Sequence, residues 1–167
     1  MAENTQIIQS TQISRGKDFV VRSEIPVAEF DAYFEEMGRN CRSPEPLKYH
    51  AILINKGSYI SLEADLTGDL SYDCDACGET FVRALDQHVS LKLIEASHVT
   101  QSEEIELSAD DLDVETYSGT KIDLHHILLS SIYLEMDEPC LCREDCKGIC
   151  SNCGKNLNEG PCSCSFE

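Results

Sequence analysis

Several residue classes are scarce in this sequence, and each shortage excludes a group of functions. Tryptophan is absent, aromatic residues make up 7% of the 167 residues, and 13 basic residues stand against 31 acidic ones, for a net charge of -18. Nucleic-acid binding usually requires a basic surface that displaces counterions, which this chain lacks overall; direct binding of RNA or DNA stays an open alternative that would need a local basic patch. The acidity either keeps the protein soluble or suits a cationic partner such as a basic protein.

Long apolar segments are also missing. The longest apolar runs are short, as in residues 51–54 (AILI), whereas a membrane-spanning helix needs roughly 18 consecutive apolar residues. Residues 1–4 do not begin the basic-then-apolar pattern of a secretory signal peptide. We therefore expect a cytoplasmic protein that is not embedded in a membrane.

Recognisable catalytic motifs are absent from the sequence. It contains no G-x4-G-K-[ST] phosphate-binding loop, no G-x-S-x-G nucleophile turn and no H-E-x-x-H zinc-protease motif. The length fits one domain, or one domain with a small appendage, and is sufficient for a hydrophobic core. We therefore expect a folded protein that is not an enzyme.

Cysteine, in contrast, is abundant and clustered. Seven of the ten cysteines lie between Cys140 and Cys164, and the others are Cys41, Cys74 and Cys77. In a secreted protein this pattern would indicate disulfides, but thiols stay reduced in the cytosol. Clustered reduced thiols are typical of metal ligands.

The spacing of the cysteines supports metal binding. Residues 74–78 (CDACG) and 150–154 (CSNCG) share the form C-x2-C-G, and Cys142-x3-Cys146 and Cys162-x-Cys164 supply two further pairs. Two thiolates three residues apart can hold one tetrahedral ion. A following glycine can adopt positive φ, which directs backbone amides towards the sulfur atoms.

These four pairs predict two zinc ions per chain, each held by four thiolates. The last two pairs are close in sequence, so closing the loop between them costs little entropy. The first set is Cys150, Cys153, Cys162 and Cys164. The second set is Cys74, Cys77, Cys142 and Cys146, which would attach the tail to the main body. Cys140 is an alternative to Cys142, and Cys41 is expected to be a structural or surface thiol.

Other thiol chemistries stay open at this point. Four thiolates suit zinc better than magnesium or calcium, although iron–sulfur clusters also use four cysteines. Residues 146–153 match the C-x3-C-x2-C spacing of radical enzymes that bind S-adenosylmethionine, but those enzymes place the motif early in a large barrel. A redox pair at residues 74–77 is disfavoured because Asp73 and Asp75 oppose thiolate formation unless a metal is bound.

The apolar pattern predicts an α+β fold with a β-rich body of antiparallel hairpins over residues 1–136 and a zinc-bound tail over 137–167 that packs on the body. Alternating residues predict strands between 48 and 96, with the first C-x2-C capping a hairpin. A short strand is expected around residues 19–21, ending before Pro26. A short amphipathic helix is expected within residues 29–40, with a stripe of four side chains: Phe30, Tyr33, Phe34 and Met37.

The second half of the body divides into an acidic stretch and the main helix. Residues 97–120 are rich in Asp and Glu, which predicts either a solvated loop with a short strand or a docking face for a basic partner. The main helix is expected over residues 121–136, with Asp123 as its N-cap. Its apolar stripe is Leu124, Ile127, Leu128, Ile132 and Met136. His125 and His126 are expected at the surface.

Residues 122–164 carry a family resemblance. An Ile-Asp-Leu opening of an apolar helix, Pro139 and the stretch 141–164, which contains Cys-Gly-x-Asn-Leu-Asn, resemble the YceD family of large ribosomal RNA subunit accumulation proteins. His126, Ser130 and Cys140 depart from the family pattern. The resemblance implies a bacterial or plastid role in accumulating large-subunit ribosomal RNA, and family genes often neighbour that of a small basic large-subunit ribosomal protein.

The main hypothesis is therefore a non-enzymatic, zinc-binding factor in ribosome biogenesis, with a basic ribosomal protein or the precursor large subunit as partner. Two alternatives stay open. One is a zinc-stabilised protein-interaction module with no link to ribosomes, and the other is a C-x2-C thiol redox enzyme.

Overall fold

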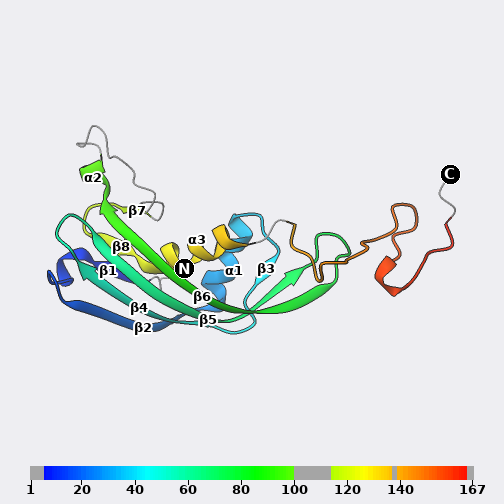
Figure 1. Cartoon of the computed structure of the whole chain (residues 1–167), viewed down its shortest axis with the longest axis horizontal. Helices are drawn as coiled ribbons and strands as arrows, with labels where there is room; N and C mark the ends of the chain where they lie inside the picture. Colours follow the sequence, from blue (N-terminus) through cyan, green and yellow to red (C-terminus); the bar gives the residue numbers. More distant parts are fainter. Residues whose placement is uncertain (1–5, 100–113, 137–138, 165–167) are drawn as a thin grey trace.

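The computed structural model describes residues 6–99, 114–136 and 139–164 of the chain (Figure 1). A six-stranded sheet has the order β2-β4-β5-β6-β7, with β3 pairing to β5, and β1 pairs with β8 in a separate ribbon. All of these pairings are antiparallel except that of β6 with β7. The strands are β1 (Ile7–Gln9), β2 (Asp18–Ile25), β3 (Cys41–Arg42), β4 (Leu47–Asn55), β5 (Ile60–Asp73), β6 (Thr80–Glu95), β7 (Val114–Tyr117) and β8 (Lys121–Asp123). The predicted α+β, β-rich class is confirmed.

Strict alternation of side chains builds the core face of the sheet. In β5, Leu62, Ala64 and Leu66 are buried, while the residues between them are not. β4 behaves in the same way, which confirms the hairpins predicted from this period-2 pattern. β2 is longer than the predicted segment at 19–21, because all eight of its residues pair with β4.

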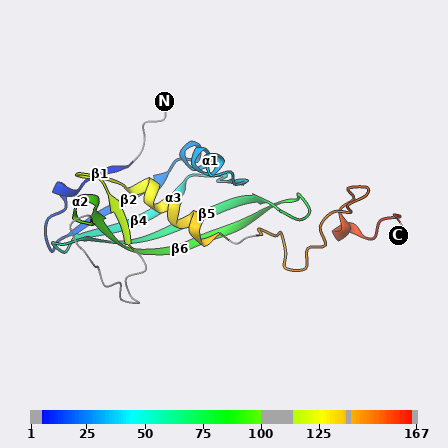
Figure 2. The ribbon, with the colours of Figure 1, turned by 90° about the horizontal axis from the view of Figure 1, so that it is seen from above.

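The helices α1 (Val27–Glu36) and α3 (Leu124–Glu135) cover one face of this sheet, called here the helical face (Figures 1 and 2). Phe30 and Phe34 of α1 are fully buried and stack with ring centroids 4.3 Å apart. Met37 was expected on the apolar stripe but lies beyond the helix and is 41% exposed. The cause is Gly38, whose φ of 71° ends the helix in the left-handed region.

The start of α3 confirms one prediction and corrects another. Asp123 caps the helix by accepting a hydrogen bond from the His126 amide at 3.0 Å. His125 was expected at the surface, but only 2% of it is exposed. Its Nε2 lies 3.1 Å from the Tyr49 hydroxyl and its Nδ1 lies 2.9 Å from Glu29 Oε2. Adjacent helix positions face different ways, so His125 points into the body while His126 is exposed.

Most of the acidic stretch predicted as a solvated loop or docking face lies outside the described residues. On either side of it, α2 (Ala96–Val99) follows β6 directly, and β7 carries Glu115. No helix in the described ranges is long and apolar enough to cross a membrane.

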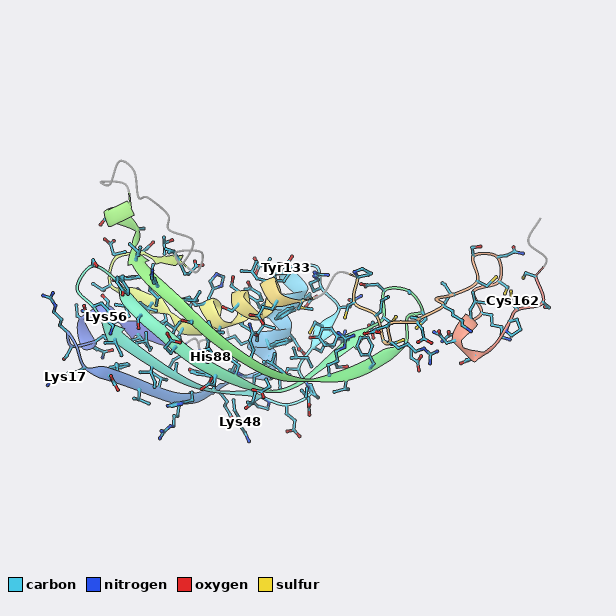
Figure 3. The ribbon with its side chains drawn as sticks, in the orientation of Figure 1. Lys17, Lys48, Lys56, His88, Tyr133 and Cys162 are labelled. Atoms are coloured by element: carbon cyan, nitrogen blue, oxygen red, sulfur yellow. The ribbon has the colours of Figure 1, made fainter. Side chains whose placement is uncertain are left out.

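The hairpin of β5 and β6 extends beyond the helices and ends at residues 74–79, where the cysteine-rich tail meets it (Figure 1). The described tail, residues 139–164, contains one short 3-10 helix, η2 (Leu157–Glu159), and continues away from the sheet. The other 3-10 helix, η1 (Ser10–Gln12), follows β1. Figure 3 shows Cys162 in the distal part of the tail, and Lys48 projecting from the open face of the sheet, opposite the helices.

Candidate metal centres

The two C-x2-C-G segments adopt the same backbone geometry. Gly78 and Gly154 have φ angles of 72° and 71°, as their positions predicted. Each glycine amide donates to the carbonyl of the first cysteine of its segment, Cys74 or Cys150, at 2.8 Å. These tight turns place the two thiols of each pair on the same side, where a single ion can contact both.

The first four-sulfur cluster joins the hairpin tip to the tail. Cys74 and Cys77 come from the turn between β5 and β6, and Cys142 and Cys146 come from the tail. The Cys74 and Cys146 sulfurs lie 3.7 Å apart, as do those of Cys77 and Cys142. All four sulfurs lie within 4.8 Å of one another.

The second four-sulfur cluster is local to the tail. It contains Cys150, Cys153, Cys162 and Cys164, again with all four sulfurs within 4.8 Å of one another. The sulfurs of Cys150 and Cys162 are 3.4 Å apart. The structure thus brings together both sets of cysteines that the spacing paired.

The geometry fits a tetrahedral ion. None of the ten cysteines forms a disulfide, whose sulfurs would be about 2.05 Å apart. In a tetrahedral zinc site, metal–sulfur bonds of about 2.3 Å give sulfur–sulfur edges of about 3.8 Å. The observed separations are close to that edge length. Magnesium and calcium prefer oxygen donors, so a donor set made of sulfur alone does not suit either ion.

Backbone amides around the first cluster favour thiolate over thiol at Cys74. Burial raises the pKa of Cys74, but the amides of Cys142, Cys77 and Ala76 outweigh it and lower the pKa to about 6. At Cys142, burial and then the neighbouring thiols raise the pKa to about 12. Four close sulfurs repel one another's negative charge, so a bound dication is needed before all four can ionise together.

The second cluster shows the same division. The amides of Cys153 and Asn152 lower the pKa of Cys150 to about 6, and the pKa of Cys164 rises to about 12 through its contact with Cys153, with burial adding to the effect. Each cluster therefore combines at least one thiol whose pKa is lowered with another whose pKa is raised.

Hydrogen bonds also fasten the tail to the hairpin beside the first cluster. The Asp75 amide donates to the Cys140 carbonyl at 2.9 Å, and the Cys140 amide donates to Asp75 Oδ2 at 2.6 Å. Arg83 donates from Nη2 to the Leu141 carbonyl at 2.7 Å. Cys140 thus contributes its backbone here, while its sulfur lies outside both four-sulfur clusters.

Cys41 also lies outside the clusters. It is 2% exposed, and burial raises its pKa to about 12, although a hydrogen bond with Tyr72 opposes the shift. This places Cys41 in the body as a buried, inert thiol.

Sequence reasoning missed one residue that links the two clusters. Asn158 lies between the ligands of the second cluster, yet its Nδ2 donates to Cys146 Sγ of the first at 3.4 Å and lowers the pKa of that thiol. Its Oδ1 accepts from the Lys147 amide at 2.8 Å. The signal was the Cys-Gly-x-Asn-Leu-Asn stretch, which was recognised as distinctive without a role for its last asparagine.

Comparison with known proteins agrees with the resemblance seen in the sequence. A sequence model of the family described as "Large ribosomal RNA subunit accumulation protein YceD" matches residues 62–167, more than half of the chain. A protein from Arabidopsis thaliana, "Large ribosomal RNA subunit accumulation protein YCED homolog 1, chloroplastic", is 24% identical over 144 residues, covering 73% of this chain and 44% of the relative. The chain therefore spans less than half the length of that relative.

No solved structure matches the chain. The matched residues include β6, α3 and both four-sulfur clusters, so the match covers the candidate metal centres as well as part of the body. The chain belongs to the YceD family, the large ribosomal RNA subunit accumulation proteins.

Proposed function

We propose that this protein is a non-enzymatic factor that supports accumulation of large-subunit ribosomal RNA, and so contributes to ribosome biogenesis in the cytoplasm. Family membership carries this proposal. The name of the plant relative points to the same process. The net charge of -18 favours a cationic partner, so the proposed partner is a basic ribosomal protein, free or on the precursor large subunit.

We further propose that each four-sulfur cluster holds one zinc ion with a structural role. A bound zinc would supply a cross-link between chain segments that otherwise have little holding them together. In the described tail, the buried residues are Cys140, Gly148 and Cys150, so no large apolar side chain forms a core there. Four protein ligands leave no open position for water or substrate, which is typical of structural sites.

The pKa of Cys74, lowered to about 6, favours a second candidate, a thiol redox enzyme. A reactive thiol must be accessible, however, and Cys74 is 3% exposed and surrounded by three other ligand-type sulfurs. Thiol titration of the zinc-loaded protein separates the two. The structural proposal expects every cluster thiol to be protected, leaving Cys41 and Cys140 to react only after unfolding. Rapid modification of Cys74 in the zinc-loaded protein would favour the enzyme.

The test of the biological role is genetic. Deleting the gene should lower the ratio of large-subunit to small-subunit ribosomal RNA, and the wild-type gene should restore it. An unchanged ratio after deletion would contradict the proposed function. Crosslinked purification from the complemented strain should enrich a basic large-subunit protein over the other ribosomal proteins, and uniform recovery of all ribosomal proteins would contradict the proposed partner.

A further inference from the structure

Within the described ranges, about half of the outer edge of β6 pairs with no other strand. β6 pairs with β5 from Thr80 to Leu93, but within the described ranges its other side pairs only with β7, at residues 92–95. In the described part of the chain, residues 84–91 pair with no strand on that side, which leaves about eight residues of open strand edge, roughly 26 Å long at about 3.3 Å per residue. Figure 2 shows this part of β6 along the border of the sheet, with α3 lying over the helical face beside it.

The backbone groups along this edge can be identified from the register. The Lys56 amide donates to Tyr59 O at the β4–β5 turn, and the Cys74 amide donates to Glu79 O at the β5–β6 turn. Hydrogen-bonded and non-bonded pairs alternate in an antiparallel ladder. Counting from either turn, the backbone N–H and C=O groups of Leu85, Gln87 and Val89 form the hydrogen bonds to β5. The residues between them, Ala84, Asp86, His88 and Ser90, direct their N–H and C=O groups away from the sheet.

A groove accompanies this edge on its helical side. Two hollows, of about 190 and 300 Å³, are lined mainly by residues 83–91 of β6 and 131–136 of α3. We call this the β6–α3 groove. Gln87 spans it by donating from Nε2 to the Ser131 carbonyl at 3.2 Å. Leu134 of α3, which borders the larger hollow, is 77% exposed and so presents apolar surface beside the strand edge.

The charges around the edge differ between its two faces. Asp86 is exposed on the open face of β6. On the same face of the neighbouring strand β5, Asp65 Oδ1 lies 2.7 Å from His88 Nδ1 and Glu63 Oε2 lies 3.1 Å from His88 Nε2. On the helical face, Leu134 offers apolar surface and Glu135 another carboxylate. Arg83 is turned towards the Leu141 carbonyl and the Phe81 ring. The four carboxylates (Glu63, Asp65, Asp86 and Glu135) therefore outnumber the three basic side chains, which are Arg83, His88 and Lys92, the last lying beside Glu63 on the open face.

We propose that the β6–α3 groove binds an extended basic segment of a partner protein, which adds to β6 as a further strand. Strand addition beside a helix-lined groove uses the free backbone groups for affinity and the alternating side chains for specificity. An occupying strand would direct alternate side chains to the two faces. Lysine or arginine on the open face would meet Asp86, and apolar residues on the helical face would cover Leu134. The choice of a basic occupant rests on the proposed function and on these charges.

A proline substitution on the strand edge tests the proposal. In A84P the outward N–H is lost and a pairing strand is blocked, while no bond to β5 is removed, because Ala84 directs its backbone away from β5. The matched control is V20P on β2, the opposite edge of the sheet. Val20 pairs with Ile52 in a position where the same alternation directs its backbone outward, and it is 50% exposed. Circular dichroism of both variants is the check that they are folded before binding is compared.

The binding probe is a fluorescent peptide of about ten alternating lysine and valine residues, long enough to cover the free edge. Its binding to the zinc-loaded full chain should be roughly tenfold weaker for A84P and unchanged for V20P. The additional variant L134A should weaken binding, since it removes the apolar contact without touching the strand edge or changing the charge of the groove. A peptide of alternating glutamate and valine should bind at least roughly tenfold more weakly than the lysine peptide.

Several outcomes would overturn the proposal. They are equal binding by A84P and the wild type, equal weakening by A84P and V20P, or preference for the glutamate peptide. A further one is self-association of the free chain that A84P abolishes, because a second copy would then occupy the edge. Binding of a single-stranded RNA oligonucleotide that A84P abolishes while the lysine peptide fails to bind would assign the edge to RNA.

A complementation experiment separates this proposal from the proposed function. If wild type restores the large-subunit RNA ratio of the deletion strain and A84P does not, while V20P does, both proposals gain support. If A84P restores the ratio as fully as wild type, the groove proposal fails and the proposed function stands. If deletion leaves the ratio unchanged, the proposed function fails, and the peptide measurements alone decide the groove.

Discussion

The body and the tail of this protein are held together by different physics. In the body, side chains such as Phe30, Phe34 and Leu66 are fully buried, so apolar burial supplies the stability. In the described tail, nothing larger than a cysteine is buried. Such a segment cannot offset the conformational entropy lost on folding by burying apolar surface. Metal binding by the clustered thiols would supply the stabilisation instead. The two regions should therefore respond to different perturbations.

The first four-sulfur cluster belongs to both regions. Cys77 at the hairpin tip meets Cys142 of the tail across 65 positions of sequence. The second cluster closes within the tail, where Cys150 and Cys162 are 12 positions apart. The first should therefore govern whether the tail stays attached to the body, and the second should govern only the local fold of the distal tail.

Removal of metal should have the largest effect. A structural zinc contributes about 10–16 kcal/mol of apparent binding free energy in small zinc domains, and the tail has no core to replace it. After chelation we expect trypsin to cut at the exposed residues Arg143, Lys147 and Lys155, while the strand signal in circular dichroism persists. A tail that stays protected after complete chelation would show that the clusters do not hold it.

Single ligand substitutions should separate the two centres. C77S should lose one metal per chain and release the whole tail, because its ligand set spans hairpin and tail. C153S should also lose one metal, but the Cys140–Asp75 hydrogen bonds and the first centre should keep the proximal tail attached. Limited proteolysis with mass analysis gives the cleavage sites, and identical cleavage patterns for the two variants would contradict the division.

A core substitution should affect the body alone. F34A removes a fully buried ring that stacks on Phe30, so we expect a loss of about 3–5 kcal/mol in the free energy of unfolding. The control M37A, at a position 41% exposed, should change stability by less than about 0.5 kcal/mol. Metal content should stay the same in both. Loss of metal from folded F34A would show that the two regions are coupled more tightly than their separate stabilisation implies.

Two glycines with nearly the same backbone conformation compare the regions directly. Gly38 in the body and Gly148 in the tail have φ of 71° and 68°. Alanine at either position costs about 1–2 kcal/mol in the left-handed region. A Cβ at Gly148 would in addition lie 3.0 Å from the Ala76 carbonyl of the first C-x2-C turn, whereas one at Gly38 meets nothing within 4 Å. G148A should therefore weaken metal retention against a competing chelator, and G38A should not. Equal retention by both would contradict close packing of the tail on the turn.

The smallest expected effect is a pH dependence confined to the body. The hydrogen bond to Asp65, with Glu63 nearby, raises the pKa of His88 above its ordinary value of 6.5. A raised folded-state pKa stabilises the protein fully below the unfolded value, and this contribution is lost as pH rises through the folded value. The wild type should exceed H88Q in stability at about pH 6 by well under 1 kcal/mol, with the difference shrinking towards about pH 8. Chemical unfolding at each pH measures it, and a difference that grows with pH would contradict the assignment.

The parts of the fold that were predictable from sequence depend on local repetition. Alternating apolar residues located β4 and β5, and the spacing of cysteine pairs grouped the eight sulfurs as the structure does. The parts that were not predictable depend on contacts distant in sequence. His125 can be buried because its two ring nitrogens find polar partners in Tyr49 and Glu29, which are 76 and 96 positions away in the sequence. Asn158 contacts Cys146 only because both clusters form, so its role required the folded tail.

The most direct test of the two-centre account is elemental analysis of the purified, untagged full-length protein, with metal counted per chain. We expect two zinc ions per chain, falling to one in C77S and to one in C153S. One zinc in the wild type that C77S leaves in place would restrict metal binding to the tail-local cluster and leave Cys74 and Cys77 to other chemistry. Iron with inorganic sulfide in place of zinc would contradict the structural-zinc account.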